Sequence, residues 1–154
     1  MSKPTIHIRK ATPPDIKIIA QFNAAMALET EDISLDLNIL TPGVQALFDD
    51  PEKGFYIVSE IDNAVVACLM ITYEWSDWRN GLFWWIQSVY VDQPFRGMGI
   101  FKEMYLYVEG KVKTTNNIAG LRLYVDKANT NARSVYKKLG MTQTNYLLYE
   151  ALNN

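Results

Sequence analysis

The chain has 154 residues, of which 49% are hydrophobic and 21% are charged, and its formal net charge at pH 7 is −2. This length suits one domain with its own apolar core, so we expect a single domain over residues 1–154. Acidic and basic residues are mixed along the chain, which argues against nucleic acid as a partner because phosphate binding needs a concentrated basic face. No apolar run reaches the ~18 residues of a membrane span, so no membrane partner is expected.

The cysteine and histidine content excludes two further classes of site. Cys68 is the only cysteine and lies in an apolar run, which favours a buried, unreactive thiol over a nucleophile. One cysteine and one histidine do not make a zinc site of the usual kind, so no metal is expected. The N-terminal residues MSKPTIHIRK lack the apolar segment of a secretory signal. We therefore expect a protein of the reducing cytoplasm.

The first third of the chain predicts one strand and two helices. The alternation in IHIRKA (residues 6–11) is typical of a strand, and TPPD after it has the threonine, prolines and early acid of a helix start. Apolar residues then recur at helical spacing up to Met26. Residues 28–38 are acidic and lose this spacing, which indicates a loop or a short helix. The next helix is expected in TPGVQALFDD, with Thr41 as its cap and Pro42 at its first position.

The middle of the chain predicts three strands and a helix. Residues 54–75 form two strands joined at Asp62 and Asn63, which suit a hairpin turn. GLFWWIQSVYV (residues 81–91) is a third strand, apolar enough to be covered on both faces. Apolar residues then repeat every four positions from Ile100, which predicts a helix.

The last part predicts a strand, a helix and a closing strand. GLRLYV (residues 120–125) is the strand, residues 129–140 form a helix that ends at Gly140, and TQTNYLLYEAL (residues 142–152) is the closing strand. The element order is β-α-α-β-β-β-α-β-α-β. Because the hairpin forces antiparallel pairing in the centre, we expect an α/β (α+β) fold with a mixed sheet and helices on both faces.

The stretch VDQPFRGMGIFKEM, between the third strand and its helix, predicts an anion site. The start of a helix has unpaired N–H groups and partial positive charge. Gly97 and Gly99 would let an anion approach these amides closely, and Arg96 adds a cation suited to phosphate oxygens. A pyrophosphate is the simplest such anion, although the stretch matches neither the dinucleotide fingerprint nor the Walker pattern.

This turn and a second block together resemble the GNAT superfamily of N-acetyltransferases. Arg96 and Gly99 are similar to the family's R-x-x-G-x-G/A motif for acetyl-CoA, and Phe101 stands where that motif has its last small residue. The second block resembles N-x-x-A-x-x-x-Y followed by Leu-Gly and a hydrophobic residue, here Asn129, Ala132, Tyr136, Leu139, Gly140 and Met141. The order of the predicted elements extends the resemblance over the whole chain.

The resemblance implies a GNAT-like fold and a binding mode for acetyl-CoA as co-substrate. The strand before the turn and the strand of LRLYV would run parallel and then splay apart. The pantetheine arm would pair with the backbone near Val89, Tyr90 and Val91. The other expected coenzyme-binding residues are Arg96, Gly97, Met98, Gly99, Ile100, Phe101 and Asn129.

Acetyl transfer from a thioester to an amine needs a neutral amine, a stabilised oxyanion and a proton for the departing thiolate. Tyr136 matches the family's usual general acid. Family members often have a carboxylate on the strand before the turn, but GLFWWIQSVYV has none. Glu29, Glu31, Glu74 and Asp77 are therefore the candidates for the base, of which we favour Glu29 and Glu74. Removal of the proton through ordered water is the alternative.

All four tryptophans fall within eleven residues, and two of them suggest an acceptor site. Trp84 or Trp85 suits the core, because neighbours on a strand face opposite sides. Trp75 and Trp78 flank a turn that contains Asp77, and aromatic faces beside a carboxylate attract a cationic primary amine. Exposed aromatic residues are equally typical of a dimer contact, so a homodimer is the competing interpretation.

Two functions follow from this sequence. The favoured one is an enzyme that acetylates a small-molecule amine, since nothing predicts the extended acidic groove of a peptide acceptor site. The alternative is a non-catalytic acyl-CoA binding or regulatory module, for which the missing strand carboxylate and Phe101 are the arguments. Tyr136 within its complete motif argues against that alternative.

Overall fold

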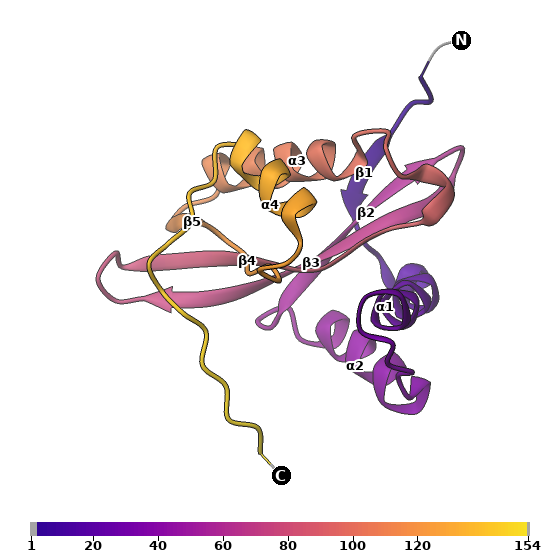
Figure 1. Cartoon of the computed structure of the whole chain (residues 1–154), viewed down its shortest axis with the longest axis horizontal. Helices are drawn as coiled ribbons and strands as arrows, with labels where there is room; N and C mark the ends of the chain where they lie inside the picture. Colours follow the sequence, from indigo (N-terminus) through magenta and orange to yellow (C-terminus); the bar gives the residue numbers. More distant parts are fainter. Residues whose placement is uncertain (1–2, 154) are drawn as a thin grey trace. The chain divides into compact units, whose positions relative to one another are not determined.

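A mixed five-stranded sheet organises the first part of the chain (Figure 1). In the computed structural model, which describes residues 3–153, the strands pair in the order β1-β2-β3-β4-β5. Neighbours from β1 to β4 are antiparallel, and β4 and β5 are parallel. The predicted mixed sheet with a parallel pair is thus confirmed. The strands are β1 His7–Lys10, β2 Gly54–Ile61, β3 Ala64–Ser76, β4 Gly81–Val91 and β5 Ile118–Arg122.

The turn between β2 and β3 is the predicted one. Asp62 and Asn63 have φ angles of 50° and 64°, in the left-handed region that a two-residue hairpin turn of the primed type requires. Asp and Asn tolerate this region better than other side chains, because their short polar groups bond locally. The sequence therefore specifies this hairpin through its turn residues.

Helices cover both faces of the sheet, as predicted (Figure 1). On one face lie α1 Ile16–Glu31 and α2 Leu37–Asp49, whose buried residues share a core cluster with Val58, Cys68 and Tyr90. The opposite face carries α3 Ile100–Thr114, whose Met104 is fully buried. Burial raises the pKa of the Cys68 thiol to about 12, which fits the expected unreactive side chain.

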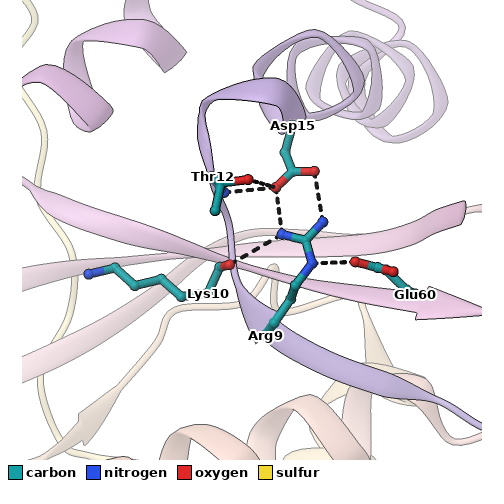
Figure 2. Close-up of polar contacts among 5 residues, drawn as sticks. All are labelled: Arg9, Lys10, Thr12, Asp15 and Glu60. Carbon is teal, nitrogen blue, oxygen red and sulfur yellow. Dashed lines mark hydrogen bonds and ion pairs between the residues drawn. The ribbon is translucent and has the colours of Figure 1, made fainter. Parts of the chain in front are cut away.

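A buried ion-pair cluster joins β1, β2 and the start of α1 (Figure 2). Arg9 donates to both carboxylate oxygens of Asp15, at 2.7 and 2.9 Å, and its Nε donates to Glu60. Asp15 also accepts from the backbone N–H of Thr12 at 2.8 Å, which caps the 3-10 turn Pro13–Asp15 before α1. The predicted Thr-Pro-Pro-Asp helix start is present, and Arg9 of β1 holds the side chain of its Asp15 in place.

The predicted start of α2 was wrong. The helix begins at Leu37 rather than after Thr41, and Pro42 lies inside it. The cap is Asp36, whose side chain accepts from the N–H of Asn38 at 2.9 Å. An Asp cap one turn upstream satisfies an early amide, and this outweighs the preference of proline for the first position.

Among residues 124–153 the structure describes one helix, and the predicted closing strand was wrong. The structure divides the chain into two units, Met1–Leu123 and Tyr124–Asn154, so the single domain stays a prediction. In the second unit α4 spans Thr130–Lys138, and Gly140 follows it with φ of 93°, as the helix stop required. Residues 142–152 form no strand, because a strand exists only where a ladder partner pairs with it. Their apolar side chains, such as Tyr149, are exposed.

Candidate functional site

The turn between β4 and α3 is an open, glycine-lined start of a helix. Gly97 and Gly99 have φ angles of 80° and 77°, and a Cβ added at either would meet no atom within 4 Å. Glycine is thus required by the backbone conformation, and the space above it is open. The amides of Gly97, Met98, Gly99 and Ile100 donate to no other group among residues 3–153. With the helix dipole, four such donors suit an anion such as a pyrophosphate.

The strand that leads to this turn has a free edge. β5 pairs with β4 only as far as Trp85, opposite Arg122, so the described chain supplies no ladder partner on that side for Ile86–Val91. The register between β3 and β4 shifts at the same place, and Ser88 has a φ of 51°. Bulges of this kind change the direction of a strand and are common beside active sites. The second half of β4 can therefore pair with an extended, amide-containing ligand.

Arg96 makes contacts that the sequence does not reveal. Its Nε donates to the carbonyl oxygen of Val91 at 2.9 Å, and one terminal nitrogen donates to Glu29 Oε2 at 2.9 Å. The other Glu29 oxygen accepts from the Tyr90 hydroxyl at 3.3 Å, and the guanidinium lies 5.3 Å from the centre of the Tyr90 ring. The hydrogen bond with Glu29 raises the pKa of Arg96. Burial, with the Glu29 charge, raises the pKa of Tyr90. Glu29, one of the two predicted bases, thus pairs with Arg96, the residue that was predicted to bind a phosphate group.

Glu74, the other candidate base, also lies in a side-chain network. Its Oε1 accepts from the indole N–H of Trp85 at 2.8 Å and from Arg122 at 2.9 Å. Arg122 in turn lies 3.6 Å from the centre of the Phe83 ring. The hydrogen bond from Trp85, followed by the pairing with Arg122, holds the pKa of Glu74 below its ordinary value. Glu74 is therefore a fixed negative charge rather than a ready proton acceptor.

The predicted acceptor residues lie at the tip of the β3–β4 hairpin. The side chains of Trp75 and Trp78 are 60% and 88% exposed, and Asp77 accepts from the backbone N–H of Trp78 at 2.8 Å. This tip is at the opposite end of β4 from the glycine turn. Gly81 and Val91 are ten residues apart, or about 33 Å along an extended strand. As expected for strand neighbours, Trp84 is buried and Trp85 is only half-buried.

The remaining predicted residues lie in the second unit, on or beside α4. Asn129 is the cap of this helix, and its side chain accepts from the N–H of Ala132 at 3.1 Å. This contact gives the N-x-x-A spacing a structural reason, because a cap residue bonds to the amide three positions later. Burial raises the pKa of the Tyr136 phenol, so it stays protonated at neutral pH. A protonated phenol can donate a proton to a developing thiolate.

Two properties of the described residues concern metals and membranes. Within residues 3–153 no three His, Cys, Asp or Glu side chains are placed to hold a metal ion together. Over the same residues, no helix has both the length and the apolar character needed to cross a membrane.

The chain is similar to known proteins in sequence and in fold. The family model described as "Acetyltransferase (GNAT) family" matches residues 22–141. The crystal structure of "a possible acetyltransferase" from Clostridium difficile 630 is 48% identical, with a TM-score of 0.91, over 97% of this chain and 98% of that one. A predicted acetyltransferase with acetyl-CoA from Clostridium acetobutylicum is 22% identical over 96% of both chains, with a TM-score of 0.77.

A third structure shows how widely the fold extends. A ribosomal-protein-alanine N-acetyltransferase from Brucella melitensis biovar Abortus 2308 is 14% identical over 97% of this chain and all of that one, with a TM-score of 0.78. At this identity the likeness concerns the fold alone. No curated protein matches the chain.

Proposed function

This chain belongs to the GNAT family of N-acetyltransferases, and from that premise we propose that it acetylates the primary amine of a small cationic molecule. Acetyl-CoA is the acetyl donor of this family, and the glycine turn before α3 is the observation that carries the proposal. Its amides have no partner in the described chain, and the space above Gly97 and Gly99 is open. The pyrophosphate of acetyl-CoA would be held at residues 97–101.

The neighbouring groups support the same position for the coenzyme. On the side of β5, Val89, Tyr90 and Val91 of β4 have no strand beside them in the described residues, so their backbone can pair there with pantetheine amides. The Arg96 side chain is 46% exposed, so its guanidinium can donate to a phosphate oxygen in addition to Val91 and Glu29. Phe101 lies with its ring 6.4 Å from that of Tyr105, so the bulky side chain has a neighbour outside the amide positions.

Tyr136 is the general acid of this proposal. The amine nitrogen forms a bond to the thioester carbonyl carbon, the carbon–sulfur bond breaks, and the phenol proton goes to the sulfur. Its raised pKa keeps the phenol protonated at neutral pH until it is needed. We keep Asn129 as a coenzyme-binding residue, with its helix-capping contact as the reason that it is held in place.

The amine loses its proton through ordered water in this proposal. Both oxygens of Glu29 already accept hydrogen bonds, and the network around Glu74 lowers the pKa of that carboxyl. A base role for Glu29 or Glu74 stays a prediction. For the cationic amine we propose the β3–β4 hairpin, where Glu74 and Asp77 supply negative charge and Trp75 and Trp78 supply exposed rings.

Thiol release tests the proposal as a whole. Free coenzyme A is measured with a thiol reagent while the protein meets polyamines, amino sugars and amino acids in the presence of acetyl-CoA. At least one primary amine is expected to stimulate release, and the product should carry one acetyl group by mass spectrometry. If no amine stimulates release from a protein that binds acetyl-CoA by calorimetry, a small-amine acceptor is excluded.

Tyr136→Phe tests the acid. We expect kcat to fall about 100-fold or more, with the Kd of acetyl-CoA unchanged, because only the proton donor is removed. Tyr149→Phe makes the same substitution on an exposed side chain of the same unit and should leave both constants unchanged. Equal kcat values in the two variants would remove Tyr136 from the reaction.

Trp78→Ala tests the acceptor site against the dimer contact. If Trp78 receives the amine, its removal raises the KM of the amine and leaves the molar mass in solution unchanged. If the mass falls by half and the KM does not change, the exposed tryptophans belong to an interface. Light scattering after size exclusion gives the mass.

A further inference from the structure

A cavity that opens to solvent lies on the α3 face of the sheet, away from the glycine turn. Its volume is about 260 Å³, and it is bounded by residues of β1 to β4 and by the last turns of α3. An apolar cavity of about 150 Å³ can hold a benzene molecule, so this one can take a single aromatic ring with a substituent. Tyr107, the cavity residue of α3 that is nearest in sequence to Ile100, follows it by seven residues, or about 10 Å along the helix, which separates the cavity from the proposed coenzyme site.

The walls of this cavity are aromatic. Phe55 and Trp84 meet edge to face with their ring centres 5.2 Å apart, and Tyr73 lies 6.3 Å from Trp84. Tyr107 contributes a fourth ring from α3. Rings in such an arrangement offer both faces and edges to a further ring, so the walls suit a flat apolar body.

The charges at the cavity are all positive. Lys10 and Lys111 line it, and no carboxylate does. The Lys10 ammonium lies 5.2 Å from the centre of the Phe55 ring, and the Lys111 ammonium lies 5.4 Å from that of Tyr107. Neither lysine has an ion-pair partner in the described part of the chain. Two unpaired ammonium groups beside an apolar cavity favour an anionic ligand.

One buried donor at the cavity has no partner. Trp84 is 6% exposed, and its indole Nε1–H has no hydrogen-bond partner among residues 3–153. A buried N–H without an acceptor is costly, so such groups are rare in folded proteins unless a ligand or water completes them. Burial also raises the pKa of the Tyr73 phenol, which therefore stays a neutral donor. The Trp84 indole N–H therefore lacks an acceptor oxygen.

From these observations we propose that the cavity between β1–β4 and the end of α3 binds a small monoanion with a flat apolar body, of the aromatic carboxylate class. The ring fills the space between Phe55, Tyr73, Trp84 and Tyr107. The carboxylate pairs with Lys10 and Lys111. This is a site separate from acetyl transfer, and it does not depend on the identity of the amine.

Benzoate is the probe for this site, and the indole N–H signals of the full chain in a 1H–15N spectrum are the readout. Trp84→Phe identifies the Trp84 signal among the four tryptophans. Benzoate is expected to shift that signal saturably with a Kd of about 1 mM or tighter, as its nine heavy atoms allow. Benzamide has the same ring without the charge, and benzylamine has the opposite charge. Both should shift the signal at least tenfold less at equal concentration.

Two double variants distinguish binding of benzoate at this cavity from a general effect of the protein's net charge. Lys10→Gln with Lys111→Gln should weaken benzoate about tenfold, because the charged partners of the carboxylate are lost. Lys17→Gln with Lys113→Gln changes the net charge equally at residues outside the cavity and should leave the Kd unchanged. The Kd should also stay the same with saturating coenzyme A, even if no amine acceptor is ever found. An unmoved Trp84 signal at 10 mM benzoate, or equal weakening in both double variants, overturns the proposal.

Discussion

Two arginine clusters in the first unit show how the same chemical groups serve different ends. In one cluster Arg9 pairs with Asp15 and Glu60, and the Asp15 side chain is only 8% exposed (Figure 2). In the other, Arg96 pairs with Glu29, and these side chains are 46% and 37% exposed. Each nitrogen of Arg9 donates within the chain, and the Arg9 side chain is less exposed than that of Arg96.

The difference teaches what separates a structural ion pair from one that can bind a ligand. The Arg9 cluster is closed, because each nitrogen of its guanidinium already donates within the chain and two carboxylates balance its charge. The Arg96 cluster is open, lies at the start of α3, and is exposed to solvent. Removing a carboxylate should therefore cost stability at the first cluster and change ligand affinity at the second.

Asp15→Ala tests whether the Arg9 cluster stabilises the fold, and its expected effect is the largest. It removes the carboxylate that accepts two hydrogen bonds from Arg9 and two from Thr12, and it leaves the guanidinium partly buried without its main partner. We expect a loss of about 3 kcal/mol in the free energy of unfolding, measured by urea denaturation. The Kd of acetyl-CoA measured by calorimetry on the folded variant should not change.

Asp50→Ala is the matched control for this experiment. Asp50 pairs with Lys53 on the surface, where both side chains are largely exposed to water. Its removal should change the stability much less, because water replaces the lost partner. Equal losses in the two variants would show that the Arg9 cluster does not hold β1 to α1.

The same carboxylate predicts a dependence of stability on pH. The hydrogen bond from Arg9 holds the pKa of Asp15 below its ordinary value of 3.8, although burial acts in the opposite direction. The folded chain therefore keeps Asp15 ionised to lower pH than the unfolded chain does. The stabilisation is complete above about pH 5, declines as the unfolded-state carboxyl takes up its proton, and is lost as the pH falls through the folded-state pKa.

Urea denaturation of the unchanged protein and of Asp15→Asn across pH 7 to 3 checks this sign. The difference in unfolding free energy should be constant down to about pH 5 and should shrink below about pH 4. Asp50→Asn run alongside subtracts the general effect of removing one negative charge. A difference that grows toward acid would contradict the assignment.

Gly99→Asn and Gly99→Val test the open site next to Arg96. Asn tolerates the left-handed backbone at this position, whereas the branched Val should lower stability by about 1–2 kcal/mol. Both side chains occupy the open space above the amides. We therefore expect acetyl-CoA to bind about 100-fold more weakly in both variants, measured by calorimetry, despite their different stabilities.

Gly110→Ala supplies the control. This glycine lies inside α3 with open space around it, so alanine should raise stability slightly without changing the affinity. If the affinity of the Gly99 variants followed their stability, with Asn binding normally, the amides of the turn would not be the coenzyme site.

The sequence predicts the parts of this fold that are specified locally. Asp62 and Asn63 adopt the positive φ angles that their turn requires, and Gly99 does the same at the start of α3. The closing strand failed for a physical reason, because residues 142–152 have the composition of a strand but pairing depends on a partner far away in the sequence. The start of α2 was predicted wrongly from Pro42, because the helix is capped by Asp36, which lies upstream of the predicted cap Thr41.

In the candidate site, too, the sequence predicts the features that are local and misses the contacts between distant residues. The glycine turn is continuous in sequence, so its composition alone indicated an anion site. The pairing of Glu29 with Arg96 joins residues 67 apart, and that of Glu74 with Arg122 joins residues 48 apart. Which carboxylate meets which arginine depends on helix placement and strand register, and neither is encoded in a local pattern. The bulge at Ser88 could likewise not be predicted from the sequence, because a bulge arises from the pairing of two strands.

Glu29→Gln is the finest test of the comparison, with the smallest expected effect. The variant keeps the shape of the side chain and removes the charge that offsets Arg96, so the positive potential at the start of α3 increases. Acetyl-CoA carries several phosphate charges and should bind about threefold more tightly at low salt, with the gain shrinking as salt screens it. Glu31→Gln removes an equal charge two residues away and should alter the Kd less.

The kcat of Glu29→Gln then separates two roles for this carboxylate. If Glu29 only holds Arg96, kcat changes less than about tenfold, because no proton passes through it. A general base contributes about 100-fold or more, so a larger fall in kcat, with tighter coenzyme binding, would return Glu29 to the role of base. Weaker coenzyme binding would instead show that Arg96 needs Glu29 in order to face the phosphates. The Arg96 cluster would then resemble the Arg9 cluster in needing its acid for geometry rather than for charge balance.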